Sequence, residues 1–227
     1  MAKILYKISS RSRPNRLKET MISIKNNASN PDYLICLTLD ENDKTVNNAE
    51  FTDWLNDNFG LELHYFFGKS KNKIDAINRD IDQFKVWDIL VNVSDDQVFV
   101  VKGFDMQIQL AFRMFFPDLD GFVHFRDSNH DPIDALSTMS IVGRKYFDID
   151  GYIYHPSYVS VWCDNEAQEV AKKRGRYKFI DSIIFEHLHP AYGKGPNDAQ
   201  YQKTESKSVH LQDKRNFDNR KRKGFSI

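Results

Sequence analysis

The stretch WDILVNVSDD, residues 87–96, indicates the fold of this chain. Its apolar part, Trp87–Val93, has little polar alternation, and such continuous apolar strands are typical of a parallel sheet covered by helices on both faces. The strand leads directly into Asp95 and Asp96. Because ligands of open α/β sheets bind beyond the carboxyl ends of the strands, we expect these carboxylates at a functional site.

Towards the N-terminus, further strand-then-helix units precede this stretch. Apolar runs predict the strands, and apolar spacings of three and four residues predict the helices. We expect strands at residues 3–8, 33–39 and 61–67, and helices that begin at Pro14 or cover residues 49–59 and 74–84. Strand-then-helix units in succession predict a mostly parallel sheet with right-handed crossovers.

Towards the C-terminus, the pattern becomes mixed. We expect helices at residues 104–116 and 165–174, and strands at residues 121–126, 139–143 and 177–185. No internal repeat or linker is visible. The sequence therefore predicts a single α/β domain with helices on both faces of its sheet and a mixed second half.

The composition is that of an ordinary globular protein. The chain has 227 residues, of which 41% are hydrophobic and 28% charged, which excludes the collagen-like, low-complexity and disordered classes. No apolar stretch approaches the roughly 20 residues needed to span a bilayer, and the N-terminus does not resemble a signal peptide. Two cysteines make neither a disulfide framework nor a zinc cluster. These features predict a cytoplasmic protein.

Charge is distributed unevenly along the chain, although its net charge is zero. Residues 203–227 hold eight Lys and Arg against three acids, a net charge of +5, so the remaining residues carry −5. A basic tail on an acidic body indicates an anionic partner, such as phosphates, nucleic acid or a membrane surface. A solvated terminal helix is the alternative interpretation.

The residues that follow the four N-terminal strands have complementary chemistry. Basic and hydroxyl groups follow the first and third strands, in SSRSRP (residues 9–14) and GKSKNK (residues 68–73). Carboxylates follow the second and fourth strands, in LDEND (residues 39–43) and VSDD (residues 93–96). Adjacent carboxylates repel each other unless a cation lies between them, so we expect a divalent metal ion. A metal ion together with Lys and Arg suits a diphosphate ligand.

The ordered set of these motifs resembles the nucleotide-binding half of GT-A glycosyltransferases, in particular the family 2-like group. Two later stretches, IVGRKYFDIDGYIYHPSYVSVWCDNE (residues 141–166) and FEHLHP (residues 185–190), resemble the acceptor-side segment, the acidic catalytic motif and the histidine of that group. The resemblance covers nearly the whole chain. Its motifs are specific as a set rather than singly.

The resemblance implies a Rossmann-like GT-A domain over residues 1–202. Residues 1–100 would form its nucleotide-binding half, and residues 101–202 its acceptor-side half. The basic tail, residues 203–227, would then fold over the active site as a lid.

Donor-binding residues are also implied by the resemblance. The resemblance places five residues in the base pocket and at the ribose: Ser9, Arg11, Pro14, Asp40 and Glu41. Around the diphosphate we expect Lys73, Asp95, Arg215 and Arg220. An ordinary acidic turn after residue 39 and a solvated helix start at Lys73 are the alternatives.

The metal-binding element of the family is Asp-x-Asp, which Asp95 and Asp96 resemble. Val-Ser-Asp-Asp departs from that pattern, so either carboxylate is a candidate ligand, and we favour Asp96. His187 resembles the histidine that completes the metal site. His189 competes with it, because residues two apart on a strand share a face. A helix cap at the acidic pair and structural roles for the histidines are the alternatives.

The implied activity is transfer of a sugar from a UDP- or GDP-linked donor to an acceptor hydroxyl, with Mn²⁺ or Mg²⁺ as cofactor. Asp164 or Glu166 would act as the general base on that hydroxyl. The resemblance implies inversion at the anomeric carbon. A glycan, a lipid-linked precursor or a protein would be the acceptor, and the basic tail allows weak contact with a membrane surface.

Three other functions compete with this interpretation. A nucleotidyltransferase has a similar sheet but usually a Gly-rich phosphate loop after its first strand, where SSRSRP has no glycine. Glycoside hydrolysis also uses two carboxylates, but it does not explain the basic tail or GKSKNK. A non-catalytic domain that binds anions or nucleic acid through the tail is the third. The neutral net charge makes nucleic acid an unlikely partner.

Overall fold

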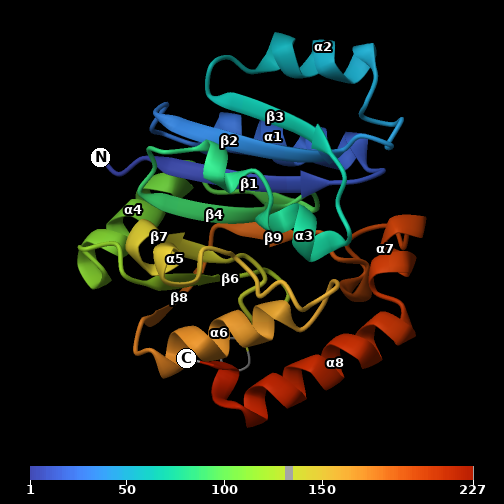
Figure 1. Ribbon diagram of the computed structural model, residues 1–227. Coiled ribbons are helices and arrows are strands. Elements are labelled where there is room, and N and C mark those ends of the chain that lie inside the picture. Colours follow the sequence, from blue (N-terminus) through green and yellow to red (C-terminus); the bar gives the residue numbers. More distant parts are fainter. Residues whose placement is uncertain (131–134, 227) are drawn as a thin grey trace.

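The computed structural model describes residues 1–130 and 135–226. Its main sheet consists of β1 (Ile4–Ser10), β2 (Tyr33–Asp40), β3 (Leu63–Gly68), β4 (Ile89–Ser94), β6 (Phe122–Arg126), β7 (Ile141–Gly143) and β8 (Tyr177–Ile183). The seven strands lie in the order β3-β2-β1-β4-β7-β6-β8 (Figure 1). β3, β2, β1 and β4 pair in parallel, β7 is antiparallel to both of its neighbours, and β6 pairs in parallel with β8. The predicted mostly parallel sheet with a mixed second half is confirmed.

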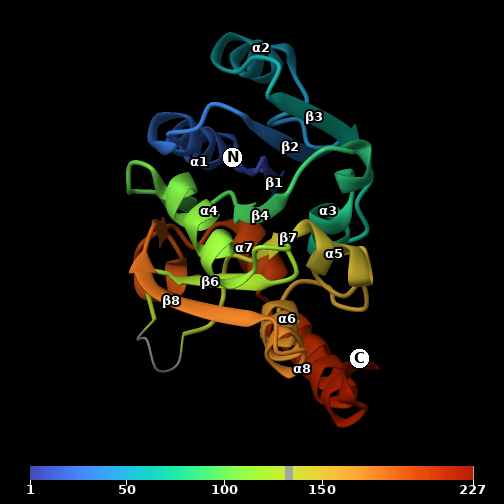
Figure 2. The ribbon, with the colours of Figure 1, turned by 90° about the vertical axis from the view of Figure 1, so that its left-hand side faces the viewer.

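Helices cover both faces of this sheet. They are α1 (Pro14–Asn27), α2 (Ala49–Asn58), α3 (Lys73–Asn78), α4 (Phe104–Phe115), α5 (Arg144–Asp150), α6 (Cys163–Lys173), α7 (Ala199–Thr204) and α8 (Lys207–Arg222), with the 3₁₀ turns η1 (Ile81–Gln83), η3 (Pro190–Tyr192) and η4 (Gly224–Ser226). One apolar core joins α1, α2 and α4 to the sheet, and a second joins α3, α5, α6 and α8 to it. Figure 2 shows the strands between α1 and α4 on one side and α3 and α5 on the other.

Side-chain alternation along β1 explains why both faces of the sheet are covered. Tyr6 and Ile8 pack in the core beneath α1, whereas Leu5 packs in the core beneath α3. Lys7, which shares the second face, is fully buried and donates a hydrogen bond to Thr38 Oγ1. Burial lowers the pKa of the Lys7 ammonium to about 8. Continuous burial of this kind is what a central parallel strand requires.

The prediction of one continuous helix over residues 74–84 is wrong. α3 ends at Asn78, and Asp80 takes a left-handed conformation (φ 71°) before η1 begins. Ile74, Ile77 and Ile81 are all buried, so the apolar spacing correctly marked a core face. The Asp80 carboxylate accepts a 2.6 Å hydrogen bond from Thr38 Oγ1 on β2, which holds the break against the sheet.

A two-stranded antiparallel sheet stands apart from the main one. It pairs β5 (Gln97–Phe99) with β9 (Phe185–His187). The single strand expected at residues 177–185 is therefore two: β8 stays in the main sheet, and the chain leaves it at Ile184 to pair with β5. Neither β5 nor α5 was predicted, because each is short and lacks a periodic pattern of its own.

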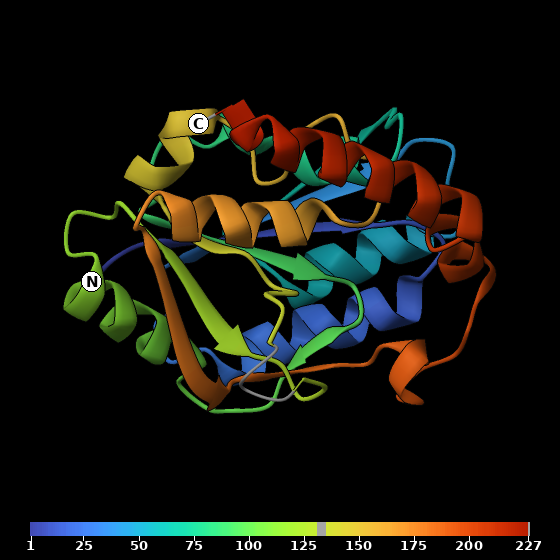
Figure 3. The same cartoon turned by 90° about the horizontal axis from the view of Figure 1, so that it is seen from below.

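The C-terminal segment packs against the domain. α8 lies along α6 (Figures 1 and 3), and α7 begins at Ala199, before the basic tail that starts at residue 203. The division of the chain at residue 202 therefore falls inside a helix, and the two functional halves of the domain stay a prediction. Among the described residues, no helix combines the length and the apolar character that crossing a bilayer requires.

We expect Ile8→Ala to lower the free energy of unfolding by about 2–5 kcal/mol, because it opens a cavity against an interior strand of the sheet. Ile8 is 0% exposed, whereas Ile149 on α5 is 55% exposed. Ile149→Ala is therefore the matched control, with an expected change of less than about 0.5 kcal/mol. Urea denaturation of the two variants measures the difference. Equal losses would contradict this assignment of the core.

Candidate functional site

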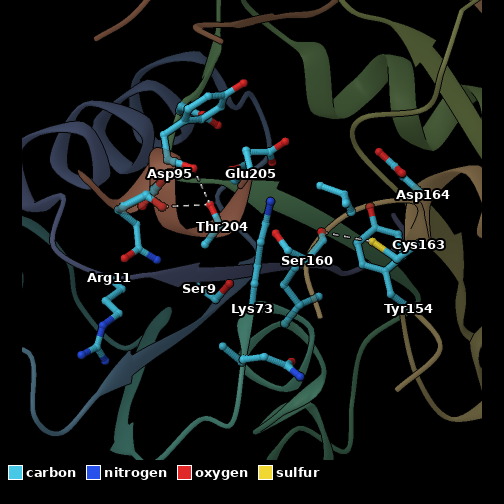
Figure 4. A pocket seen from close by; sticks show the side chains of 18 of the residues that line it. Ser9, Arg11, Lys73, Asp95, Tyr154, Ser160, Cys163, Asp164, Thr204 and Glu205 are labelled. Atoms are coloured by element: carbon cyan, nitrogen blue, oxygen red, sulfur yellow. Dashed lines mark hydrogen bonds between the residues drawn. The ribbon is translucent and has the colours of Figure 1, made fainter. Parts of the chain in front are cut away.

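A cavity of about 770 Å³ opens at the carboxyl ends of β1, β2, β3 and β4. The start of α3, the segment of residues 159–165 and α7 form its other walls (Figure 4). Most of the predicted site residues line it: Ser9, Arg11, Asp40, Lys73, Asp95, Asp96, Asp164, His187 and His189. Reading the residues after each strand thus found one continuous site.

Asp95 is buried and both of its oxygens have protein partners. Ser10 Oγ donates to Oδ2 at 2.6 Å, and Arg13 Nη1 donates to Oδ1 at 3.1 Å. Burial and the neighbouring charge of Asp96 together raise the pKa of Asp95 above its ordinary value. Asp95 therefore anchors the loop before α1 to the end of β4.

Asp96 is equally buried, but its Oδ1 has no hydrogen-bond partner among residues 1–130 and 135–226. That oxygen faces His187 Nε2 at 3.4 Å. Arg16 Nη1 lies 3.8 Å from the other oxygen, and Arg13 Nη1 lies 3.9 Å from it. Burial alone would raise the pKa of Asp96, but the facing imidazole holds it below its ordinary value.

The small β5–β9 sheet brings His187 to Asp96. β5 starts one residue after Asp96, and Gln97 is paired with His187 across the ribbon. The backbone N–H of Leu188 also donates to the carbonyl of Asp96 at 2.8 Å. A histidine far away in the sequence is thereby fixed beside the acidic pair.

Asp127 faces the other side of the same imidazole and was not predicted. Its Oδ2 lies 3.7 Å from His187 Nδ1, and it also accepts hydrogen bonds from His130 and Thr138. Burial disfavours the imidazolium, but Asp127 and Asp96 outweigh it and raise the pKa of His187 to about 9. Asp127 directly follows β6, so the rule that found the other residues would have found it as well.

Arg13 links the acidic pair to the C-terminal segment. Besides Asp95, its guanidinium donates to both oxygens of Asp198 at 2.8 and 2.9 Å, and Asp198 is the N-cap of α7. A bidentate Arg–carboxylate pair is geometrically specific. This pair holds α7, with Tyr201 and Thr204, over the cavity. No local sequence pattern indicates this pair, because the partners lie far apart in the chain.

Lys73 and Asp40 occupy two further walls of the cavity. Lys73 is exposed at the cavity. Partial loss of water disfavours its ammonium group, but nearby carboxylates, Glu205 above all, outweigh that effect and raise the pKa of Lys73. In Figure 4 its amino group lies between Asp95 and Asp164. Asp40 pairs with Arg11 Nη1 at 2.5 Å through one oxygen, while its buried Oδ1 has no hydrogen-bond partner. Both groups are therefore positioned to meet a ligand.

Asp164 and Glu166, the two candidates for the general base, face different ways. They lie in the first turn of α6, and residues two apart on a helix point about 200° apart around its axis. Asp164 faces the cavity, and burial raises the pKa of its carboxyl group. Glu166 is buried against Arg220, with contacts of 2.8–3.0 Å, and accepts from Tyr158 Oη at 2.7 Å. The prediction of Glu166 as a base is corrected accordingly.

Four other predicted residues do not line the cavity. Pro14 forms the first turn of α1, and Glu41 is exposed and pairs with Lys69 at 3.5 Å. Arg215 is exposed on α8, and Arg220 is held by Glu166. The prediction that these two arginines contact a diphosphate is therefore corrected. The charge pattern alone could not show which side of α8 faces the domain.

His187 is better placed than His189 to share a ligand with Asp96. His189 Nδ1 accepts from the Ala191 N–H at 3.3 Å, and its ring packs 5.1 Å from that of Tyr201. Burial and the nearby His187 lower the pKa of His189. It therefore lines the cavity as a neutral ring.

A metal ion at Asp96 and His187 is compatible with the geometry. Among residues 1–130 and 135–226, no three His, Cys, Asp or Glu side chains gather closely enough to hold a metal ion by themselves. Two ligands that each lie about 2.1 Å from one ion are about 3.0–3.4 Å apart. The 3.4 Å between Asp96 Oδ1 and His187 Nε2, and the missing partner of that oxygen, satisfy this spacing. The remaining ligands would come from a substrate or water.

Comparison with known proteins identifies the fold. No protein-family model matches the chain, and no curated protein does so by sequence. Solved structures match. The mannosyltransferase PcManGT from Pyrobaculum calidifontis, in complex with GDP-Man and Mn²⁺, has a TM-score of 0.68 at 10% identity, over 83% of this chain and 57% of that one. Residues 1–349 of TarS from S. aureus, in complex with UDP-GlcNAc, have a TM-score of 0.62 at 12% identity, over 81% and 58%.

The chain has the GT-A fold. The architecture that the sequence motifs implied is thus confirmed. This chain spans less than two thirds of the length of either glycosyltransferase. The 4-diphosphocytidyl-2C-methyl-D-erythritol synthase from Anaerococcus prevotii also matches, with a TM-score of 0.54 at 11% identity, over 79% of this chain and 87% of that one. The fold therefore does not distinguish sugar transfer from nucleotide transfer.

In metal-free protein, we expect the His187 imidazole to titrate near pH 9, instead of about 6.5, because two carboxylates face it. The ring is then protonated at neutral pH and loses its proton as the pH rises through 9. NMR of the imidazole signals measures the midpoint. Asp127→Asn should lower the midpoint, and Asp118→Asn, at an exposed carboxylate, should leave it unchanged. A wild-type midpoint below 7 would contradict this arrangement.

Proposed function

We propose that the chain is a metal-dependent glycosyltransferase that moves a sugar from a nucleoside-diphosphate sugar to an acceptor hydroxyl, with inversion at the anomeric carbon. The observation that carries the proposal is the unpartnered Asp96 oxygen beside His187, in the same cavity as Asp164. The structural similarity to glycosyltransferases solved with GDP-Man and Mn²⁺ or with UDP-GlcNAc supports it.

The donor would lie along the carboxyl ends of β1 to β4. Arg11 and the free oxygen of Asp40 offer a donor and an acceptor to a uracil or guanine base or its ribose. Ser9 lies beside them, and Lys73 offers a cation to the diphosphate. Asp96 and His187 would hold Mn²⁺ or Mg²⁺, which when bound would neutralise the charge that develops on the leaving diphosphate.

Asp164 is the proposed general base. It lies in the cavity on the acceptor side, and its raised pKa makes it a stronger proton acceptor than an exposed aspartate. Deprotonation of the acceptor hydroxyl by one carboxylate permits direct displacement of the nucleoside diphosphate, and that displacement inverts the anomeric carbon. A glycan, a lipid-linked precursor or a protein would supply the hydroxyl.

Nucleotidyl transfer is the second candidate, because the Anaerococcus prevotii synthase shares the fold. The loop after β1 weighs against it. Residues 10–14 contain no glycine, and Arg13 within them is engaged by Asp95 and Asp198 rather than free for a triphosphate. The products separate the two reactions: sugar transfer releases a nucleoside diphosphate, whereas nucleotidyl transfer releases pyrophosphate.

Thermal unfolding with UDP, GDP, CDP and ADP tests donor binding. At a hundredfold excess over the dissociation constant, one diphosphate should stabilise the fold by about 2.7 kcal/mol, a rise of about 5–10 °C in Tm, when Mn²⁺ is present. Asp96→Asn should abolish the part of the shift that needs Mn²⁺, and Asp53→Asn, at an exposed site on α2, should keep it. If no diphosphate changes the Tm of the wild type, the proposed function is refuted.

Asp164→Asn tests the general base. We expect turnover to fall by about 10²–10⁴-fold, because the carboxamide cannot accept the proton. The donor-induced rise in Tm should persist, since Asp164 is not proposed to touch the diphosphate. Release of nucleoside diphosphate from the identified sugar nucleotide, into water or an acceptor mixture, measures turnover. Asp148→Asn on α5 is the control, and wild-type turnover in Asp164→Asn would exclude this role.

A further inference from the structure

A fully buried carboxylate on α8 accepts hydrogen bonds from the backbone of the segment that leads to Asp164. Asp213 is 0% exposed, and its two oxygens accept hydrogen bonds from three consecutive backbone N–H groups. The Val159 N–H donates at 3.0 Å, the Ser160 N–H at 2.8 Å and the Val161 N–H at 2.9 Å. Successive N–H groups that converge on one anion form a concave site for negative charge.

This contact is not a by-product of regular secondary structure. Residues 159–161 lie between α5 and α6, outside any helix or strand, so their N–H groups have no partners in a ladder. Burying a charge is costly unless it is well hydrogen-bonded, and within the described part of the chain Asp213 meets that condition through these three amides. The position of α8 and the path of the segment therefore fix each other.

The segment of residues 159–161, which Asp213 holds, also forms a wall of the cavity. Val159, Ser160 and Val161 line it, and the Ser160 hydroxyl oxygen is buried there with no hydrogen-bond partner. Asp164 follows Val161 by three residues. A shift of the segment would therefore move the proposed base relative to the acceptor.

Between residues 159–161, which bind Asp213, and the proposed base Asp164, the backbone takes a strained turn at Trp162. Its φ is 64°, in the left-handed region that a bulky residue rarely adopts. α8 supports this turn from outside: the Phe217 ring lies 5.3 Å from the Trp162 ring, and Lys214 Nζ lies 5.0 Å from it. Such a conformation persists only where its surroundings hold it in place.

A second contact holds the chain just after the base. Arg220 of α8 pairs with both oxygens of Glu166 of α6. Figure 3 shows α8 running along α6, in agreement with Figure 1. α8 thus contacts the chain on both sides of Asp164, and none of the Lys and Arg residues of α8 lines the cavity.

We infer that Asp213 is a positioning residue: it holds residues 159–162 so that Asp164 faces the acceptor hydroxyl. This inference rests on the proposed function, in which Asp164 is the general base. It gives the C-terminal helix a role in turnover without contact to the donor.

Asp213→Asn tests the inference, with Asp218→Asn, at a half-exposed carboxylate on the same helix, as the matched control. The carboxamide keeps the shape but presents an N–H₂ group to backbone donors. We expect turnover to fall tenfold or more while the donor-induced rise in Tm and the KM for the sugar nucleotide stay at wild-type values. Hydrogen exchange at the amides of residues 159–161 should accelerate in Asp213→Asn and not in Asp218→Asn.

The possible results separate this inference from the proposed function. A wild type that binds no nucleoside diphosphate refutes the proposed function, and the inference with it. A wild type that binds and turns over donor, with an Asp213→Asn variant of equal turnover, overturns the inference alone. A parallel loss of donor affinity and turnover would also overturn it, because it would indicate general unfolding. Should Asp213→Asn fail to fold, Asp213→Glu gives the same comparison, because it keeps the carboxylate but displaces it by one methylene group from the amides of residues 159–161.

Discussion

The constraint on which the site depends is the burial of two adjacent carboxylates at the end of β4. Asp95 and Asp96 are each 5% exposed, and such a pair requires compensating charge and hydrogen bonds. The compensation comes from distant parts of the chain: Ser10 and Arg13 from the loop before α1, and His187 from β9. The acidic pair therefore organises the N-terminal and C-terminal segments around one point.

This arrangement offsets part of the negative charge of the carboxylates without any added ion. Arg13 serves Asp95 and Asp198 at once, and a protonated His187 lies between Asp96 and Asp127. The metal ion that we propose at Asp96 would displace the His187 proton, because a metal-bound imidazole nitrogen carries none. Proton and metal would then compete for one nitrogen, and metal affinity would rise with pH over the range in which His187 is protonated.

Much of the fold was predictable because its central strands are uninterrupted apolar runs. The same regularity places the residue after each strand on one edge, which identified Asp40, Asp96 and the cavity around them. Local pattern failed where long-range contacts decide the geometry. The break at Asp80 depends on Thr38 of a neighbouring strand, and the orientation of Glu166 depends on Arg220 of α8.

The remaining errors have one physical origin. The basic C-terminal segment was interpreted through its charge, whereas its packing depends on a buried acid and an aromatic ring, Asp213 and Phe217. Charge counts describe the solvent-exposed side of a helix, and they say nothing of the few residues that fix its position. Arg13 and Asp198 escaped notice for a related reason, since no local pattern joins residues so far apart in the sequence.

The β5–β9 ribbon has a consequence for the folding of the chain. It pairs Gln97 with His187, and a contact between such distant residues forms slowly because a long loop must close first. The pairs β1–β2 and β2–β3 join residues about 29 positions apart, whereas β4 joins β1 across 85 residues. Asp96, which follows β4, and His187, on β9, therefore both reach this edge through the closure of long loops, and the two meet only when distant parts of the chain have come together.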